Sequence, residues 1–79
     1  VLLRKLVEDC VAVNEVAFEL KNNEFSNLVD GNLVVETDPQ ALQFIIRNLL
    51  VNANKYTENG AIKVLATPGD GWIQIMVSD

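Results

Sequence analysis

The residues best suited to chemistry lie in one segment, residues 46–57, which carries asparagines, a lysine and a tyrosine at helical spacing. On a helix each residue turns about 100°, so Asn52 lies about 40° from Asn48, with Lys55 and Tyr56 close beside them. An asparagine oxygen is a neutral hard ligand that suits Mg²⁺, which usually keeps several waters and binds a nucleotide's phosphates. Lys55 can balance phosphate charge as a point cation, and Tyr56 offers a flat ring and a hydroxyl. This polar stripe, Asn48, Asn52, Lys55 and Tyr56, could therefore hold a magnesium nucleotide.

The same residues also have a plain structural interpretation. Two asparagines four residues apart are common on solvated helix faces, and a lysine is more often solvated than bound to phosphate. Tyr56 is more often found in a core or at its rim. Asp79, taken alone, is an ordinary carboxylate at the end of a strand. Residue types and spacing by themselves leave both interpretations open.

The composition excludes several classes of site. The chain has 79 residues, with 11 acidic and 6 basic side chains, a net charge of −5, one cysteine and no histidine. Catalytic pairs and metal sites that need histidine cannot be built from this chain alone. The acidic balance disfavours nucleic acid or an anionic membrane as the main partner. No apolar run approaches the ~20 residues that span a bilayer. The hydrophobic fraction of 49% is typical of a packed globular domain.

The first half of the chain predicts one helix and two strands. Residues 2–21 have the spacing of an amphipathic helix. Its expected apolar positions are Leu3, Leu6, Cys10, Val13 and Ala17. Residues 24–29 and the β-branched run 33–36 are expected to be strands. The Asp30-Gly31 turn between them would allow a hairpin.

The second half predicts a longer helix and two more strands. Asp38 can cap the helix and Pro39 suits its first position, so we expect a helix from 39 to about Tyr56. Its expected apolar face consists of Leu42, Ile45, Ile46, Leu49, Leu50 and Ala53. Gly60 is expected to adopt a positive φ in the turn. Strands follow at 62–66 and 72–77, around a turn at 68–71. This order predicts an α+β fold, a two-layer α/β sandwich with helices on one face of a mainly antiparallel or mixed sheet.

The segment from residue 37 to residue 64 resembles the N-box region of sensor histidine kinases, members of the GHKL (Bergerat-fold) ATP-binding superfamily. The N-box reads much like Asn-Leu-Leu-x-Asn-Ala-x-Lys-Tyr-Thr, followed by a glycine-containing turn and a strand. The matching run here is Asn48-Leu49-Leu50-Val51-Asn52-Ala53-Asn54-Lys55-Tyr56-Thr57. Residues 75–79 look like the strand that enters the G1 box, Asp-x-Gly-x-Gly, of which only the Asp is present. The resemblance covers essentially the whole chain. It implies that residues 1–79 are the N-terminal part of a catalytic (HATPase_c) domain, an incomplete Bergerat fold without the G1 glycines, the ATP lid and the G2 box.

The resemblance implies a role for each matching position and implies ATP and Mg²⁺ as cofactors. Asn52 matches the asparagine that binds Mg²⁺, and Asn48 matches the one near the phosphates and the metal. Lys55 matches a basic residue that contacts phosphate, and Tyr56 matches an aromatic residue that lines the nucleotide pocket. Asp79 matches the G1 aspartate, whose carboxylate accepts a hydrogen bond from the adenine amino group.

Asn48 also bears on the type of reaction that the resemblance implies. Relatives that hydrolyse ATP carry a glutamate one helical turn before the metal-binding asparagine, where it activates water. Asn48 is an amide that cannot take up a proton at neutral pH, so transfer to a protein is favoured over hydrolysis. In the family the acceptor is a histidine on a separate dimerisation domain, and a response regulator receiver domain is the next partner. The resemblance therefore implies a histidine kinase of a two-component signal-transduction system, with a cytoplasmic catalytic domain.

The sequence begins in mid-pattern without a methionine, so we expect a piece of a longer protein. We expect this piece alone to bind ATP weakly or not at all, and to self-associate. Two other interpretations stay open. The chain could be a degenerate GHKL-fold module that binds partners without kinase activity. It could also be a small α+β domain in which the polar stripe is coincidental.

Overall fold

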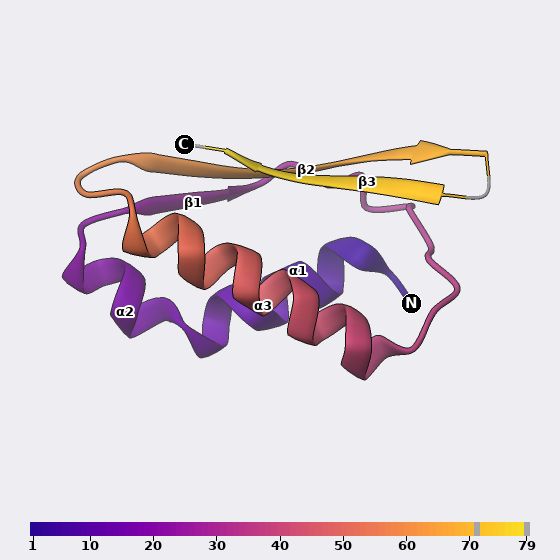
Figure 1. Cartoon of the computed structure of the whole chain (residues 1–79), viewed down its shortest axis with the longest axis horizontal. Helices are drawn as coiled ribbons and strands as arrows, with labels where there is room; N and C mark the ends of the chain where they lie inside the picture. Colours follow the sequence, from indigo (N-terminus) through magenta and orange to yellow (C-terminus); the bar gives the residue numbers. More distant parts are fainter. Residues whose placement is uncertain (71, 79) are drawn as a thin grey trace.

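The chain folds into two layers, a sheet and a set of helices that cover one of its faces (Figure 1). The computed structural model describes residues 1–70 and 72–78. The helices are α1 (Leu3–Val13), α2 (Glu15–Leu20) and α3 (Pro39–Lys55). The strands are β1 (Glu24–Asn27), β2 (Ala61–Gly69) and β3 (Trp72–Ser78). This arrangement confirms the expected α+β class and the two-layer architecture.

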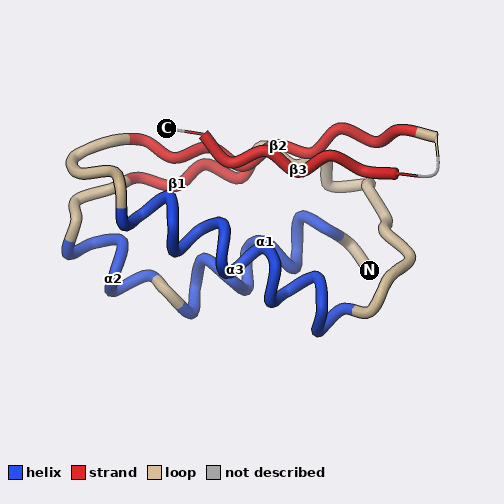
Figure 2. The backbone as a smooth tube through the Cα atoms, in the orientation of Figure 1, coloured by secondary structure: helices blue, strands red, loops and turns tan. Residues whose placement is uncertain are grey.

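The sheet is mixed and its strands lie in the order β1-β2-β3 (Figure 2). β1 and β2 run parallel, with Glu24 opposite Ala61, and α3 forms the crossover between them. Parallel neighbours need such a crossover, whereas antiparallel neighbours can be joined by a tight turn. β2 and β3 form the antiparallel pair, with Lys63 opposite Ser78 and Gly69 opposite Trp72.

The start of α3 follows the sequence signals closely. Asp38 Oδ1 accepts a hydrogen bond from the backbone N–H of Gln40 at 3.0 Å. Pro39 occupies the first helical position, where its missing N–H leaves no helical bond unmade. The helix ends at Lys55, as expected to within one residue. The predicted cap therefore fixes the end of α3 that lies farthest from the polar stripe.

The hydrophobic core lies between the helices and the inner face of the sheet. Its buried members are Leu3, Leu6, Val7, Cys10, Phe18, Val29, Leu42, Ile46, Leu50 and Val64. On α3, Leu42, Ile46 and Leu50 are buried as expected, but Ile45 is 52% exposed. Three side chains of β3, Ile73, Ile75 and Val77, pack against this core and remain half-buried.

The prediction of one helix over residues 2–21 is wrong, because the helix breaks at Asn14. Its side-chain Nδ2 donates to the carbonyl of Cys10 at 2.9 Å, which is the acceptor that a continuing helix would offer to the Asn14 N–H. That N–H donates instead to the carbonyl of Val11 at 3.1 Å. After the break Phe18 becomes buried and stacks on Phe25, with ring centroids 3.9 Å apart.

The change of direction also overturns two expected core positions. Val13 is 74% exposed, and Ala17 is exposed as well. Val13 and Ala17 would lie on the apolar face of α1 only if that helix continued straight through Asn14. The apolar positions of α1 itself, up to Cys10, are buried as expected.

The predicted hairpin between residues 24–29 and 33–36 is also wrong. β1 pairs with β2, and residues 33–36 lie beside the N-terminus through a single bridge between Leu2 and Val34. Val35 donates its N–H to the carbonyl of Val1 at 2.8 Å. The Asp30 turn forms, because Asp30 Oδ1 accepts from the N–H of Asn32 at 2.9 Å, but it directs the chain away from β1.

Two turn predictions need correction. Asn59, and not Gly60, takes the left-handed conformation, with φ of 54°. Pro68 and Gly69 belong to β2, where they pair with Ile73 and Trp72, so the turn is shorter than residues 68–71. Pro68 fits there because β1 pairs with β2 only as far as Val64, so this part of β2 has no described strand on its other side.

Candidate functional site

A groove of about 460 Å³ runs between α3 and β3. Asn52 and Tyr56 of the polar stripe line it from the helix. The other lining residues are Leu49, Ala53, Thr57, Ile75, Met76, Val77 and Ser78. The groove therefore joins one carboxamide and one phenol to a largely apolar surface. Concave apolar sites with a few polar groups are the usual form of a small-molecule site.

The stripe does not enter the groove as a whole. Asn48 and Lys55 are exposed and do not line it. The Lys55 ammonium lies 5.5 Å from the centroid of the Tyr56 ring, in cation–π range. Tyr56 itself is 78% exposed, so its ring covers the rim of the groove. The structure thus brings together Asn52, Tyr56 and, at the rim, Lys55.

The carboxamides of Asn48 and Asn52 make no hydrogen bond to any other residue that the structure describes. Both are exposed and both are available to a ligand. Asp79, the predicted adenine contact, lies outside the described residues. Ser78, the last residue that the structure describes, lines the groove.

The C-terminal end of α3 is held in place by a set of residues that we call the Asn23 network: the buried Asn23, Asn54 and Thr57, and the half-buried Gly60. Asn23 Nδ2 donates to Asn54 Oδ1 and to the Thr57 carbonyl, both at 2.8 Å. Asn23 Oδ1 accepts from the N–H of Gly60 at 3.0 Å. Asn54 Nδ2 donates to the carbonyl of Ala17 at 3.3 Å. The network joins the turn before β1 to the turn that follows α3.

A second, exposed layer joins the same two turns. Asn22 Nδ2 donates to Asn59 Oδ1 at 2.9 Å, and both residues have positive φ, 55° and 54°. Asparagine tolerates this conformation better than other residues with a side chain, apart from aspartate and histidine. Lys21 Nζ donates to the Lys55 carbonyl at 2.9 Å, which places an ammonium at the negative end of the α3 dipole. These contacts fix the groove's helical wall relative to the sheet.

The structural role of Asn54 was not predicted from the sequence, although a signal for it exists. Leu42, Ile46 and Leu50 recur every four residues on the buried face of α3, and Asn54 is the next member of that series. A carboxamide at a core position needs partners, because an unpaired buried polar group is costly. Asn54 is 9% exposed, and Asn23, also 9% exposed, supplies the partner.

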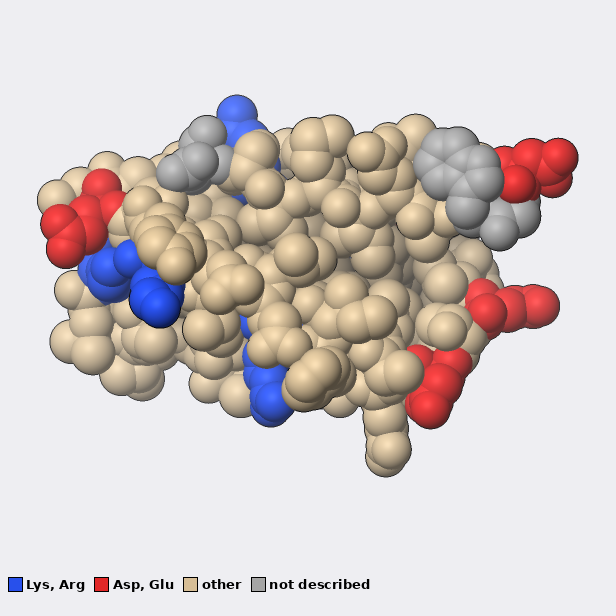
Figure 3. All heavy atoms as spheres, in the orientation of Figure 1, with Lys and Arg blue, Asp and Glu red and all other residues tan. Residues whose placement is uncertain are grey.

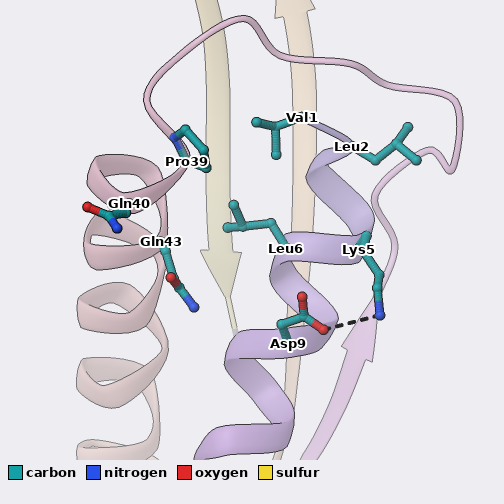
Figure 4. A pocket seen from close by; sticks show the side chains of 8 residues that line it. All are labelled: Val1, Leu2, Lys5, Leu6, Asp9, Pro39, Gln40 and Gln43. Atoms are coloured by element: carbon teal, nitrogen blue, oxygen red, sulfur yellow. Dashed lines mark ion pairs between the residues drawn. The ribbon is translucent and has the colours of Figure 1, made fainter.

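A second hollow of about 430 Å³ lies between the first turns of α1 and α3 (Figure 4). Apolar side chains of Leu2, Leu6 and Pro39 line it. Lys5 and Asp9, at one edge, form an ion pair with 3.3 Å between Nζ and Oδ1. None of the predicted site residues lines this hollow, so it does not support the predicted chemistry.

The charges and nucleophiles of the chain add few candidates. On the face formed by α3 and β3, charged side chains gather mainly toward the two ends of the molecule (Figure 3). Burial and the neighbouring Asp9 raise the pKa of the Cys10 thiol above its ordinary value, although Arg47 acts in the opposite direction. The thiol is therefore protonated at neutral pH and is not a nucleophile.

Within residues 1–70 and 72–78, no group of three or more His, Cys, Asp or Glu side chains is arranged to hold a metal ion. Among the described helices, none combines the length and apolarity needed to cross a membrane. In comparisons with known proteins, no protein-family model matches the chain and no curated protein matches it.

Proposed function

We propose that this chain belongs to the ATP-binding catalytic domain of a sensor histidine kinase, which transfers the γ-phosphoryl group of ATP to a histidine. The observation that carries the proposal is that Asn52 and Tyr56 line the groove between α3 and β3. Both residues belong to the run that resembles the N-box. Opposite them, Ile75 and Val77 supply an apolar wall that suits a planar base.

Asn52 is suited to a Mg²⁺ ion that arrives with the nucleotide. Its carboxamide is exposed and has no partner among the described residues, so its oxygen is free to bind. Mg²⁺ usually takes one or two protein ligands and completes its shell with water and phosphate oxygens. The absence of a carboxylate cluster in the described part of the chain fits this mode better than an all-protein cage. When bound, the ion would neutralise charge on the phosphates.

The lysines at the end of α3 support a phosphate site there. The Lys21 ammonium bonds to the Lys55 carbonyl, so it lies at the same end of α3 as Lys55 in a chain that is acidic as a whole. Asn48 stands one turn before Asn52 and cannot act as a base. In the proposed transfer the bond between the γ-phosphorus and its bridging oxygen breaks, a phosphorus–nitrogen bond to the histidine forms, and ADP leaves. The chain has no histidine, so the acceptor lies on another domain.

One observation favours a second candidate, a module of the same fold that binds nucleotide or a partner without catalysis. Asn48 and Lys55 lie outside the groove lining. The two candidates differ in phosphoryl transfer, because only the kinase gives radiolabelled phosphohistidine from γ-labelled ATP.

The test is calorimetric titration of MgATP into the intact protein that carries this chain. We expect Asn52→Ala to weaken binding by roughly tenfold or more, since a metal-bound nucleotide loses its protein ligand. Gln43→Ala is the matched control, because Gln43 is another exposed amide on α3 that does not line the groove. Equal affinities for the Asn52→Ala variant and the unchanged protein would contradict the proposal.

The 79-residue chain alone allows a second measurement. We expect weak or undetectable calorimetric binding, so the sensitive readout is the change in amide resonances on adding MgATP at high concentration. The proposal predicts that any shifts cluster at Asn52, Tyr56 and the end of β3. Shifts confined to the hollow between α1 and α3 would argue against it.

A further inference from the structure

β3 is an edge strand whose outer side has no partner in the described structure. The sheet order places β2 on one side of β3 and no described strand on the other. An unpaired edge presents a row of backbone donors and acceptors that can pair with another chain. Proteins usually protect such edges with charged residues, proline or bulges. β3 contains no charged residue and no proline over Trp72–Ser78.

The hydrogen bonds of β2 show which residues of β3 face outward. A strand residue directs its N–H and C=O to the same side. The carbonyls of Gly60 and Val64 accept from β1 and its extension, from Glu24 and Leu28, each at 2.9 Å. The odd-numbered residues of β2 therefore face β3 and bond to their register partners Gln74, Met76 and Ser78. The remaining alternate residues, Ile73, Ile75 and Val77, direct their N–H and C=O groups to the free edge.

We propose that this edge binds a second copy of the chain through antiparallel pairing of β3 with β3, centred on Ile75. In this register Ile75 faces the partner's Ile75, and Ile73 faces the partner's Val77. Over residues 72–78, each copy offers three N–H and three C=O groups on that edge, and the register pairs all of these. A shift by two residues leaves some of them unpaired, so the central register satisfies the most hydrogen bonds.

The side chains and charges agree with this pairing. On the helix side of the sheet the facing residues are Ile73, Ile75 and Val77, all apolar and only half-buried in one copy. On the outer side Gln74 faces the partner's Met76, and both are exposed and uncharged. The chain has a net charge of −5, but residues 72–78 carry no charged side chain. Two copies would therefore pair along β3 without bringing like charges directly opposite each other. On the face beside β3, acidic atoms lie toward the two ends, and basic atoms also appear at the upper and lower margins nearer the middle (Figure 3).

This pairing does not depend on the proposed kinase function. It gives a residue-level form to the self-association expected from the sequence. It would also join two three-stranded sheets into one continuous sheet with both helical layers on the same side. The partner's Ile75 would then extend the apolar wall beside the groove.

The test is sedimentation velocity of the 79-residue chain over a range of concentrations at low salt. We expect a reversible monomer–dimer equilibrium. The double variant Gln74→Lys with Met76→Lys places lysine opposite lysine twice across the proposed interface. Like charges directly opposite are unfavourable, so the dimer should weaken by about tenfold.

The matched variant is Gln74→Glu with Met76→Lys, which places glutamate opposite lysine twice at the same positions. It should dimerise at least as tightly as the unchanged chain. Circular dichroism of the monomers checks that both variants fold, since both side chains are exposed. A chain that stays monomeric at every concentration overturns the proposal. So does a dimer that both variants leave unchanged, or one that both weaken equally.

Discussion

Asn52 and Asn54 lie two residues apart on α3 but differ in burial and in hydrogen bonding. Asn54 is 9% exposed, and its carboxamide bonds to Asn23 and to the Ala17 carbonyl. Asn52 is exposed beside the groove and bonds to no described residue. The same functional group therefore holds the fold together in one place and stays available for a ligand in the other. Burial and partners, and not residue type, separate the two roles.

The difference has a thermodynamic side. A buried polar group that loses its partner carries the full cost of its desolvation, whereas an exposed one returns to water. The Asn23 network should therefore tolerate substitution poorly, and the polar stripe should tolerate it well. Substitutions in the two regions test this contrast.

The largest effect is expected for Asn23→Ala. It removes three hydrogen bonds and leaves Asn54 Oδ1, the Thr57 carbonyl and the Gly60 N–H without that partner. We expect the free energy of unfolding to fall by about 3 kcal/mol, measured by urea denaturation. A loss below about 1 kcal/mol would mean that water replaces the side chain and that the network is not a structural requirement.

The next effect is expected for Gly60→Ala. A Cβ at Gly60 would lie 2.6 Å from Thr57 Cγ2, which is closer than the two atoms can approach. We expect destabilisation of about 2 kcal/mol, the usual size for overpacking. Thr57→Ser removes that methyl and keeps the hydroxyl. In the Thr57→Ser background, Gly60→Ala should therefore lower the free energy of unfolding by clearly less. An equal loss in both backgrounds would show that the Thr57 methyl is not the source of the strain.

A smaller effect is expected for Asn59→Ala, in the exposed layer beside the network. Alanine at φ of 54° is strained by about 1 kcal/mol, and the bond to Asn22 is lost as well. Asn59→Gly loses the same bond, but glycine fits the backbone angle. Its melting temperature should therefore be higher than that of Asn59→Ala. The reverse ranking would show that the greater freedom of glycine in the unfolded chain outweighs its better fit to this backbone angle.

The smallest effects are expected in the polar stripe. Asn48→Ala and Asn52→Ala should each change the free energy of unfolding by no more than about 0.5 kcal/mol, because both side chains are exposed and unpaired in the described structure. Urea denaturation without nucleotide measures this. A loss comparable to that of Asn23→Ala would remove the contrast between the two regions.

Local signals in the sequence predicted much of the fold. The cap at Asp38, the apolar series of α3 and the alternation of β3 each act within a few residues, and all three appear in the structure. The two largest failures have different causes. The break at Asn14 rests on a local bond from its side chain to the Cys10 carbonyl, which apolar spacing does not reveal. The parallel pairing of β1 with β2 needs a strand that follows 34 residues later, so no local pattern could predict it.

The candidate site was predicted in part for the same reason. Helical spacing is local, so it placed Asn48, Asn52, Lys55 and Tyr56 along one stripe. Which of them line a groove depends on where β3 crosses α3, and only Asn52 and Tyr56 do. The partner of Asn54 lies 31 residues away, so its structural role could not be predicted from α3 alone.

The contact between Asn23 and Gly60 joins residues 37 apart in the chain. The Gly60 N–H is held by Asn23 Oδ1 across this loop, so its proton should exchange with solvent only when the two turns separate. Its exchange rate would report the opening of the whole α3 crossover through a single resonance.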